Sequence, residues 1–132
     1  MIVGLGADIV EIRRIKDAVE RWGERFLNRV FTADERKYCI HGRNNPYPHL
    51  AARFAAKEAA IKALTPLRTH GEPAPNLKDI EIVRDATGRP SICLHGQTQN
   101  VLSSHSLLVS ISHEKHYAVA TVVLARTVTQ AV

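Results

Sequence analysis

The chain has 132 residues and carries 18 Lys and Arg against 13 Asp and Glu, a formal net charge of +5 that predicts an acidic partner. Its 45% hydrophobic content excludes an intrinsically disordered chain, and its length predicts one domain over residues 1–132. No apolar run approaches the roughly 20 residues of a membrane span, so we expect no membrane segment and no secretory signal. The two cysteines, Cys39 and Cys93, are too few for a disulfide scaffold and favour a reducing cytoplasm.

The first half of the chain predicts one strand followed by helices. Its opening residues are apolar except for Asp8, as in a strand. After Glu11 the apolar residues recur every three or four positions, which places them on one stripe of a helix. Thr32 and Glu35 have the spacing of a capping box, which marks the start of the next helix. In chain order we therefore expect a strand over 1–9, helices over 12–26 and from 32 onward, a loop over 42–48 and an alanine-rich helix over 49–64.

The second half predicts mainly strands. Pro66 forbids continuation of the long helix, and two further prolines and a glycine follow it within a loop. In chain order we expect this loop over 65–76, strands over 79–85 and 91–95 joined by a turn over 86–90, a short helix over 97–104, and a final hairpin of 107–113 and 118–125. The whole pattern predicts an α+β fold, with a mainly antiparallel sheet packed with helices.

Asp8 breaks the apolar pattern of the first strand. Alternation places Ile2, Gly4, Gly6 and Asp8 on one face, so a carboxylate lies beside two positions without side chains. One interpretation is a hollow with an anionic group at its edge. The other is that Asp8 caps the following helix and that the glycines mark bulges.

Glu58 breaks the apolar stripe of the long helix, between Phe54 and Ile61. A buried carboxylate costs several kcal/mol unless it is paired or bound to a metal. The alternative is an ordinary pair with Lys62, four residues on, worth about 0.3–0.5 kcal/mol. Considered together, Asp8 and Glu58 favour a site for a hard cation, because two carboxylates with open water positions suit Mg²⁺ bound to a substrate phosphate.

Further polar residues extend this candidate site. Arg53, Lys57 and Lys62 surround the second carboxylate, where they either hold phosphates or form a solvated helix face. His113 ends one face of a predicted strand, and it is either a core or edge residue or a group for phosphate binding or proton transfer. His113 and His116 have no further ligands at zinc-like spacing, so this pair predicts no zinc site.

Most of the excess positive charge lies between Arg13 and Arg43, with nine Arg and Lys against five Asp and Glu. Arg14, Arg21 and Arg25 fall on one side of the first helix, where they either dock an acidic protein helix or pair with Asp17. A surface that binds nucleic acid carries aromatic residues interleaved with the basic ones, and we expect none on this basic face. We therefore expect a protein partner and no nucleic acid.

Two motifs resemble those of holo-acyl-carrier-protein synthases. Residues 4–12, with Arg14 and Ile15 after them, are similar to the opening motif of that family. Residues 53–64 are similar to its second motif, RFAAKEA..KA. Segments similar to later parts of the family follow in the right order at 79–82, 88–90 and 110–114. The chain is identified on these grounds as a member of the small bacterial phosphopantetheinyl transferases.

The resemblance implies a fold, a reaction and an assembly. Such enzymes move the 4′-phosphopantetheine arm of coenzyme A to a serine of apo-acyl carrier protein and release adenosine 3′,5′-bisphosphate. They use Mg²⁺ and form homotrimers with active sites between subunits. The sequence does not say whether the carrier serves fatty-acid, polyketide or other synthesis. The residues alone leave open a non-catalytic basic module and a Mg²⁺-dependent hydrolase of another diphosphate.

The resemblance also implies a role for each candidate residue. The matching positions are Asp8 and Glu58 for the metal, Arg53, Lys57, Lys62 and His113 for the coenzyme A phosphates, Gly88 and Pro90 for the turn lining the adenine pocket, and Arg14, Arg21 and Arg25 for carrier docking. The base for the serine hydroxyl is a metal-bound water, Glu58 or His113, and Lys62 offsets charge on the departing bisphosphate. The loop over 65–71 departs from the family, whose usual continuation is glycine-rich.

Overall fold

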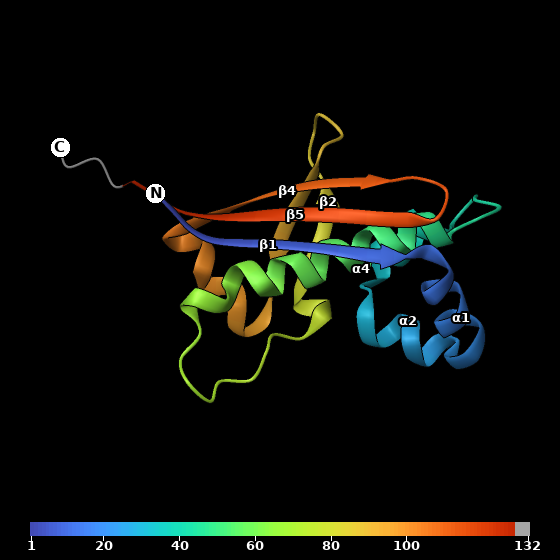
Figure 1. The fold of residues 1–132 in the computed structure, drawn as a ribbon, viewed down its shortest axis with the longest axis horizontal. Coiled ribbons are helices and arrows are strands. Elements are labelled where there is room, and N and C mark those ends of the chain that lie inside the picture. Colours follow the sequence, from blue (N-terminus) through green and yellow to red (C-terminus); the bar gives the residue numbers. More distant parts are fainter. Residues whose placement is uncertain (129–132) are drawn as a thin grey trace.

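A three-stranded antiparallel sheet carries one long helix across one face (Figure 1). The strands lie in the order β1 (Ile2–Glu11), β5 (Tyr117–Arg126) and β4 (His105–His113). The helix is α4 (Tyr47–Leu64), which contacts all three strands. The computed structural model describes residues 1–128, so the last four residues of the predicted domain lie outside the described residues.

A second, two-stranded sheet packs against this unit. It consists of β2 (Ile80–Arg84) and β3 (Pro90–Leu94), which pair antiparallel and contact α4 and β4 respectively. The hairpin buries four aliphatic side chains on its inner face, Ile80, Ile82, Ile92 and Leu94. Every strand pairing in residues 1–128 is antiparallel, so the predicted α+β class is confirmed.

The remaining helices are short. They are α1 (Ile12–Trp22), α2 (Glu24–Val30) and α3 (Ala33–Ile40), with 3₁₀ turns η1 (Thr65–Leu67), η2 (Leu77–Asp79) and η3 (Gly96–Ser103). The predicted short helix over 97–104 is thus a 3₁₀ segment, and the predicted loop over 65–76 begins with a 3₁₀ turn. No helix among residues 1–128 is both long and apolar enough to cross a membrane.

The predicted single helix over 12–26 is wrong, because it divides at Gly23. This residue has φ of 53°, a left-handed value that glycine adopts without a steric penalty. Its amide donates to Val19 O at 2.8 Å and closes α1, and α2 begins at the next residue. An unbroken apolar stripe therefore runs over two helices that point in different directions (Figure 1).

The two predicted helix starts have different outcomes. The capping box at α3 is confirmed, since Glu35 N donates to Thr32 Oγ1 at 3.2 Å and Thr32 N donates to Glu35 Oε1 at 2.9 Å. Helix α4 begins at Tyr47, two residues earlier than predicted. Pro48 fits there because the first turn of a helix needs no amide donor.

The glycines of β1 allow α4 to lie directly on the strand. A Cβ added to Gly4 would overlap Ala63 O, and one added to Gly6 would overlap Ala59 O. The predicted hollow therefore does not lie beside the glycines themselves, because helix backbone fills that space. A register irregularity between Ile2 and Gly4 matches the bulge interpretation at that end of the strand.

We predict that Gly6→Ala destabilises the fold, because the methyl group meets a helix carbonyl that moves only with α4. Overpacking of this kind costs about 1–3 kcal/mol or more. Urea unfolding monitored by circular dichroism measures the change in free energy of unfolding. Ala33→Ser is the control, since Ala33 is exposed on α3 and lies outside both the β1–α4 contact and the outer face of the sheet. Equal unfolding midpoints for Gly6→Ala and the parent would contradict this account of the contact.

Candidate active site

Asp8 and Glu58 line one hollow between β1 and α4. Asp8 lies on the α4-facing side of β1, and Glu58 lies on the side of α4 that turns toward the end of this strand. The hollow has a volume of about 270 Å³. Its other lining includes Arg14 and the apolar side chains of Ile15, Phe26 and Phe54. The structure thus brings together the two carboxylates that interrupt the apolar patterns.

Neither of the simpler interpretations of the two carboxylates holds. The residue at the N-cap of α1 is Glu11, so Asp8 does not cap that helix. Lys62 pairs with Asp8 rather than with Glu58: its Nζ lies 3.2 Å from Asp8 Oδ1 and donates to Ala7 O at 2.9 Å. Lys62 therefore bridges the long helix to the strand at the rim of the hollow.

The electrostatics of the hollow favour a cation. Partial burial raises the pKa of Glu58, the charge of Asp8 raises it further, and Lys62 lowers it. One ammonium group thus leaves part of the repulsion between the two carboxylates uncompensated. Carboxylate oxygens that face an open hollow are the donor set that Mg²⁺ prefers, so these residues fit that ion.

Lys57 does not meet the sequence expectation of a phosphate contact. Its side chain is fully buried, and its Nζ lies 2.7 Å from Glu35 Oε1. The same ammonium donates to the carbonyls of Leu77 and Ile80, both at 2.8 Å. All three donors are used inside the protein, so Lys57 neither reaches a ligand nor forms part of a solvated helix face.

Arg53 is also buried, and it belongs to a different cluster. Its guanidinium lies 4.0 Å from the ring centroid of Tyr38, and those of Arg43 and Arg84 lie 5.0 and 4.9 Å from the same ring. None of the three forms an ion pair with a carboxylate in the described part of the chain. We call these four residues the Tyr38 arginine cluster. Three cations without counter-ions suit a polyanionic ligand.

His113 lies beside this cluster. Its ring centroid is 5.7 Å from that of His49, whose Nε2 lies 3.0 Å from Arg43 Nη1. Burial lowers the pKa of His49, and the charges of Arg43, His113, Arg53 and Arg84 lower it further. His113, the histidine predicted for the site, is exposed at the end of β4. It lies next to a strongly positive region of the surface. Sequence reasoning missed Tyr38, His49 and Arg84, which come from three separate elements and carry no shared spacing.

The predicted adenine turn lies apart from the carboxylates within one chain. Gly88, with φ of 85°, lies in the β2–β3 connection, and Pro90 is the first residue of β3. The tip of this hairpin projects beyond the main sheet (Figure 1). Asp85 Oδ1 shapes the turn by accepting hydrogen bonds from the amides of Thr87 and Arg89. Gly88 and Pro90 are not among the residues that line the Asp8–Glu58 hollow.

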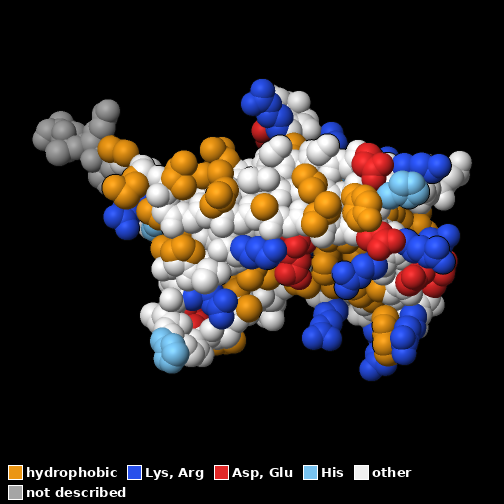
Figure 2. Space-filling view, in the orientation of Figure 1, with side chains coloured by type: hydrophobic (Ala, Val, Ile, Leu, Met, Phe, Trp, Pro, Cys, Tyr) orange, Lys and Arg blue, Asp and Glu red, His pale blue; other side chains and the backbone are white. Residues whose placement is uncertain are grey.

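The basic residues predicted to dock a carrier lie on two helices rather than one. Arg14 and Arg21 belong to α1, whereas Arg25 follows Gly23 on α2. All three are exposed, and none is ion-paired with Asp17 in the residues described. Figure 2 shows Lys and Arg side chains gathered at this end of the molecule.

Comparison with known proteins decides the family. The sequence profile of the 4′-phosphopantetheinyl transferase superfamily matches residues 4–122. The chain belongs to this superfamily. The family assignment from the motifs is thereby confirmed, and with it the prediction of a transferase.

Curated relatives and solved structures agree with the profile. A holo-[acyl-carrier-protein] synthase of Protochlamydia amoebophila is 46% identical over 120 residues, 91% of this chain and 95% of that protein. One of Chloroflexus aggregans is 51% identical over 128 residues, 89% of this chain and 91% of that protein. A crystal structure of a holo-(acyl-carrier-protein) synthase from Bacillus anthracis in complex with CoA (3′,5′-ADP) has a TM-score of 0.76 at 34% identity, covering 96% of this chain and 99% of that one.

We predict that Glu58→Gln stabilises the metal-free protein at pH 7–8. A raised pKa means that the folded state holds the proton more tightly than the unfolded state. The stability associated with Glu58 is therefore fully present below its ordinary pKa of 4.5 and is lost as pH rises through the folded-state value. Thermal unfolding without metal should show a difference between variant and parent that is present at pH 8 and vanishes below pH 4.5. A variant that is less stable at pH 8 would contradict the repulsion between Asp8 and Glu58.

We also predict that removing each of the two lysines of α4 has a different effect on the free energy of unfolding. Lys57→Met leaves Glu35 as an unpaired buried charge, which costs about 3–5 kcal/mol in free energy of unfolding. Lys62→Met leaves stability within about 1 kcal/mol of the parent, because its pair with Asp8 is partly solvated. Chemical denaturation of both variants checks this, and equal losses would show that Lys57 is not the buried structural ion.

Proposed function

We propose that the chain transfers the 4′-phosphopantetheine arm of coenzyme A to a serine of an apo-acyl carrier protein and releases adenosine 3′,5′-bisphosphate. The observation that carries this proposal is the placement of Asp8 and Glu58 in one hollow, with Lys62 at its rim, in a member of this superfamily. The relatives named holo-[acyl-carrier-protein] synthase support the acceptor. The complex of the B. anthracis relative supports coenzyme A as donor.

Asp8 and Glu58 are the residues that would hold Mg²⁺. When bound there, the ion supplies charge neutralisation at the diphosphate of coenzyme A. The side chain of Lys62 is about half exposed and pairs with one of the two carboxylates. From that position its ammonium offsets the charge that develops on the departing bisphosphate.

The Tyr38 arginine cluster supports a second contact with coenzyme A. Arg43, Arg53 and Arg84 present cationic groups around one ring, with His113 on the neighbouring strand. We assign this region to the phosphate groups of the nucleotide end of the donor, because guanidinium groups bind phosphate oxygens in pairs of parallel hydrogen bonds.

Two side chains remain candidates for the base that takes the serine proton. Burial and the charge of Asp8 raise the pKa of Glu58, which makes its carboxylate a better proton acceptor. His113 is exposed, and a histidine side chain is a common proton acceptor in catalysis. The two differ in position, since Glu58 lies inside the hollow and His113 beside the arginine cluster.

We propose a homotrimer with active sites between subunits. The outer face of the main sheet, opposite α4, exposes large apolar side chains, including Leu5, Ile9, Leu108 and Val119. Apolar strips of this kind run over β1, β4 and β5 in Figure 2 and favour association with further copies. A neighbouring subunit would also supply the Gly88–Pro90 turn, which lies away from the hollow in its own chain.

The exposed surface of α1 and α2 is the proposed docking site for the carrier. Arg14 lines the hollow itself, so a partner bound to these helices lies beside the proposed metal. Arg21 packs over the ring of Trp22 at 4.9 Å, so the expectation that this basic face carries no aromatic residue is wrong. The half-exposed indole adds an apolar contact within the basic surface. An acidic helix complements such a surface. We propose a cytoplasmic location, which the free thiols of Cys39 and Cys93 support.

The transfer is tested by incubating the protein with coenzyme A, Mg²⁺ and an apo carrier protein, and weighing the carrier by mass spectrometry. We expect the carrier to gain the mass of the phosphopantetheine arm. Glu58→Ala should slow this gain by about 10²–10³-fold, because the hollow loses one of two groups that position charge at the reacting diphosphate. Asp34→Ala, which removes an exposed carboxylate outside the hollow, should leave the rate unchanged.

Two outcomes would overturn the proposal. Full activity of Glu58→Ala would show that this residue is not a metal ligand. Release of free phosphopantetheine in the absence of a carrier would indicate a hydrolase that acts on the same donor.

A further inference from the structure

Three metal-ligating side chains lie on the outer face of the β2–β3 hairpin, and none has a part in the proposed transfer. Glu81 and Cys93 are direct partners in the strand register. His95 follows Cys93 by two residues, so the alternation of the strand directs it to the same face. The opposite face of the hairpin carries the buried aliphatic side chains, which separates this group from the core.

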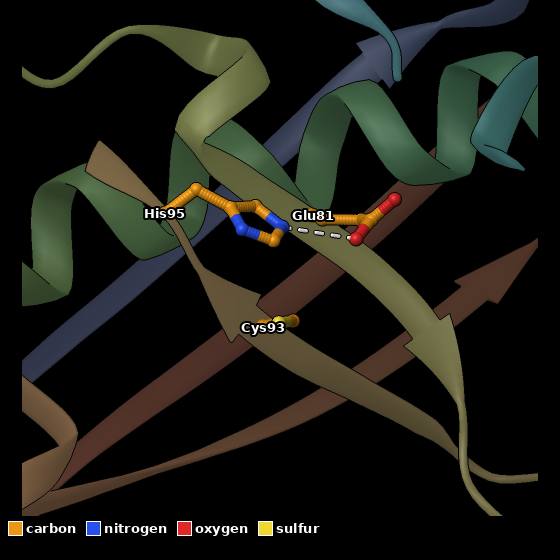
Figure 3. Close-up of side chains that lie close together, drawn as sticks. All are labelled: Glu81, Cys93 and His95. Carbon is orange, nitrogen blue, oxygen red and sulfur yellow. Dashed lines mark hydrogen bonds and ion pairs between the residues drawn. The ribbon is translucent and has the colours of Figure 1, made fainter. Parts of the chain in front are cut away.

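The ligand atoms of the three residues converge. One atom from each of Glu81, Cys93 and His95 lies within 4.8 Å of the other two. Glu81 Oε1 and His95 Nε2 lie 3.0 Å apart (Figure 3). The carboxylate side chain is only 12% exposed, whereas the imidazole is 48% exposed. An ion can therefore approach from the histidine side while the other two ligands are held by the protein.

The surroundings fix the carboxylate in place. Thr32 Oγ1 donates to Glu81 Oε2 at 2.6 Å, which leaves Oε1 directed at the histidine. Partial burial raises the pKa of Glu81, but the hydrogen bonds from Thr32 and His95 outweigh it and lower the pKa overall. The carboxylate is consequently ionised at neutral pH. An outer hydrogen bond that orients a ligand in this way is a regular feature of metal sites.

The histidine is anchored through its backbone. His95 N donates to Asp79 O at 2.8 Å, and His95 O accepts from Thr98 Oγ1 at 2.7 Å. These bonds tie the residue to η2 and η3 on either side of the hairpin. The imidazole thus needs only side-chain rotation to adjust its distance to an ion.

We propose that Glu81, Cys93 and His95 bind Zn²⁺ at a site separate from the Asp8–Glu58 hollow. Sulfur, imidazole nitrogen and carboxylate oxygen together are a donor set for zinc and chemically similar transition metals, whereas Mg²⁺ prefers oxygen alone. Three protein ligands leave a fourth position for water. Binding replaces the thiol proton of Cys93 and the hydrogen bond between His95 Nε2 and Glu81 Oε1.

Co²⁺ is the probe for this site, because cobalt bound to a thiolate gives a charge-transfer absorption that cobalt bound to oxygen lacks. The full-length protein is titrated with Co²⁺ in excess Mg²⁺, which occupies oxygen-only sites. We expect one Co²⁺ per chain with the thiolate band, and loss of that band on addition of Zn²⁺. Cys93→Ser should abolish the band and weaken Zn²⁺ binding by at least about tenfold.

The other cysteine provides the matched control. Cys39 is fully buried in the core, so Cys39→Ala should keep the cobalt band. His95→Ala changes an exposed side chain and should weaken Zn²⁺ binding to a similar extent, which keeps the test decisive if Cys93→Ser does not fold. A band that persists in Cys93→Ser, or the absence of any stoichiometric band in the parent protein, would overturn the proposal.

Discussion

The close contact between α4 and β1 determines the rest of the structure. Because Gly4 and Gly6 carry no side chains, the helix backbone at Ala59 and Ala63 reaches the strand directly. The same register places Asp8 two residues beyond Gly6, beside the turn of α4 that bears Glu58. A larger residue at either glycine would lift the helix and separate the two carboxylates. The hollow in which we propose a metal site is thus a consequence of backbone packing.

The two lysines of α4 point in different directions. Lys57 points inward and joins Glu35 of α3 to the carbonyls of Leu77 and Ile80, so it links three elements within the core. Lys62, five residues later, projects from a different side of the helix and reaches Asp8. Of the two lysines in one motif, the buried Lys57 is therefore structural, and the partly exposed Lys62 is the one that we propose to act on the substrate.

Much of the fold could be predicted from the sequence, namely those features that one local sequence pattern determines. Alternation predicted the face shared by Gly4, Gly6 and Asp8, and the capping spacing predicted the start of α3. The break at Gly23 was missed because the apolar spacing continues across it. The prediction of a hollow beside the glycines failed for a different reason. The pattern of residues in a strand does not show which element packs against that strand.

The candidate site was predictable only in part. The two carboxylates could be found because each interrupts an apolar pattern within its own element. The Tyr38 arginine cluster could not be found, because Arg84 reaches the ring from β2 while Arg43 and Arg53 reach it from the loop before α4 and from α4 itself. The Glu81, Cys93 and His95 group depends on the pairing register of β2 with β3, which the spacing of the residues does not specify.

The central claim is that Asp8 and Glu58 together hold one divalent cation per chain. Mn²⁺ can replace Mg²⁺ in oxygen sites, and its free concentration is measured directly by electron paramagnetic resonance. With coenzyme A present, we expect one Mn²⁺ bound per chain in the parent and in Asp34→Asn, and loss of that ion in Asp8→Asn and in Glu58→Gln. Unchanged Mn²⁺ binding in both hollow variants would contradict it.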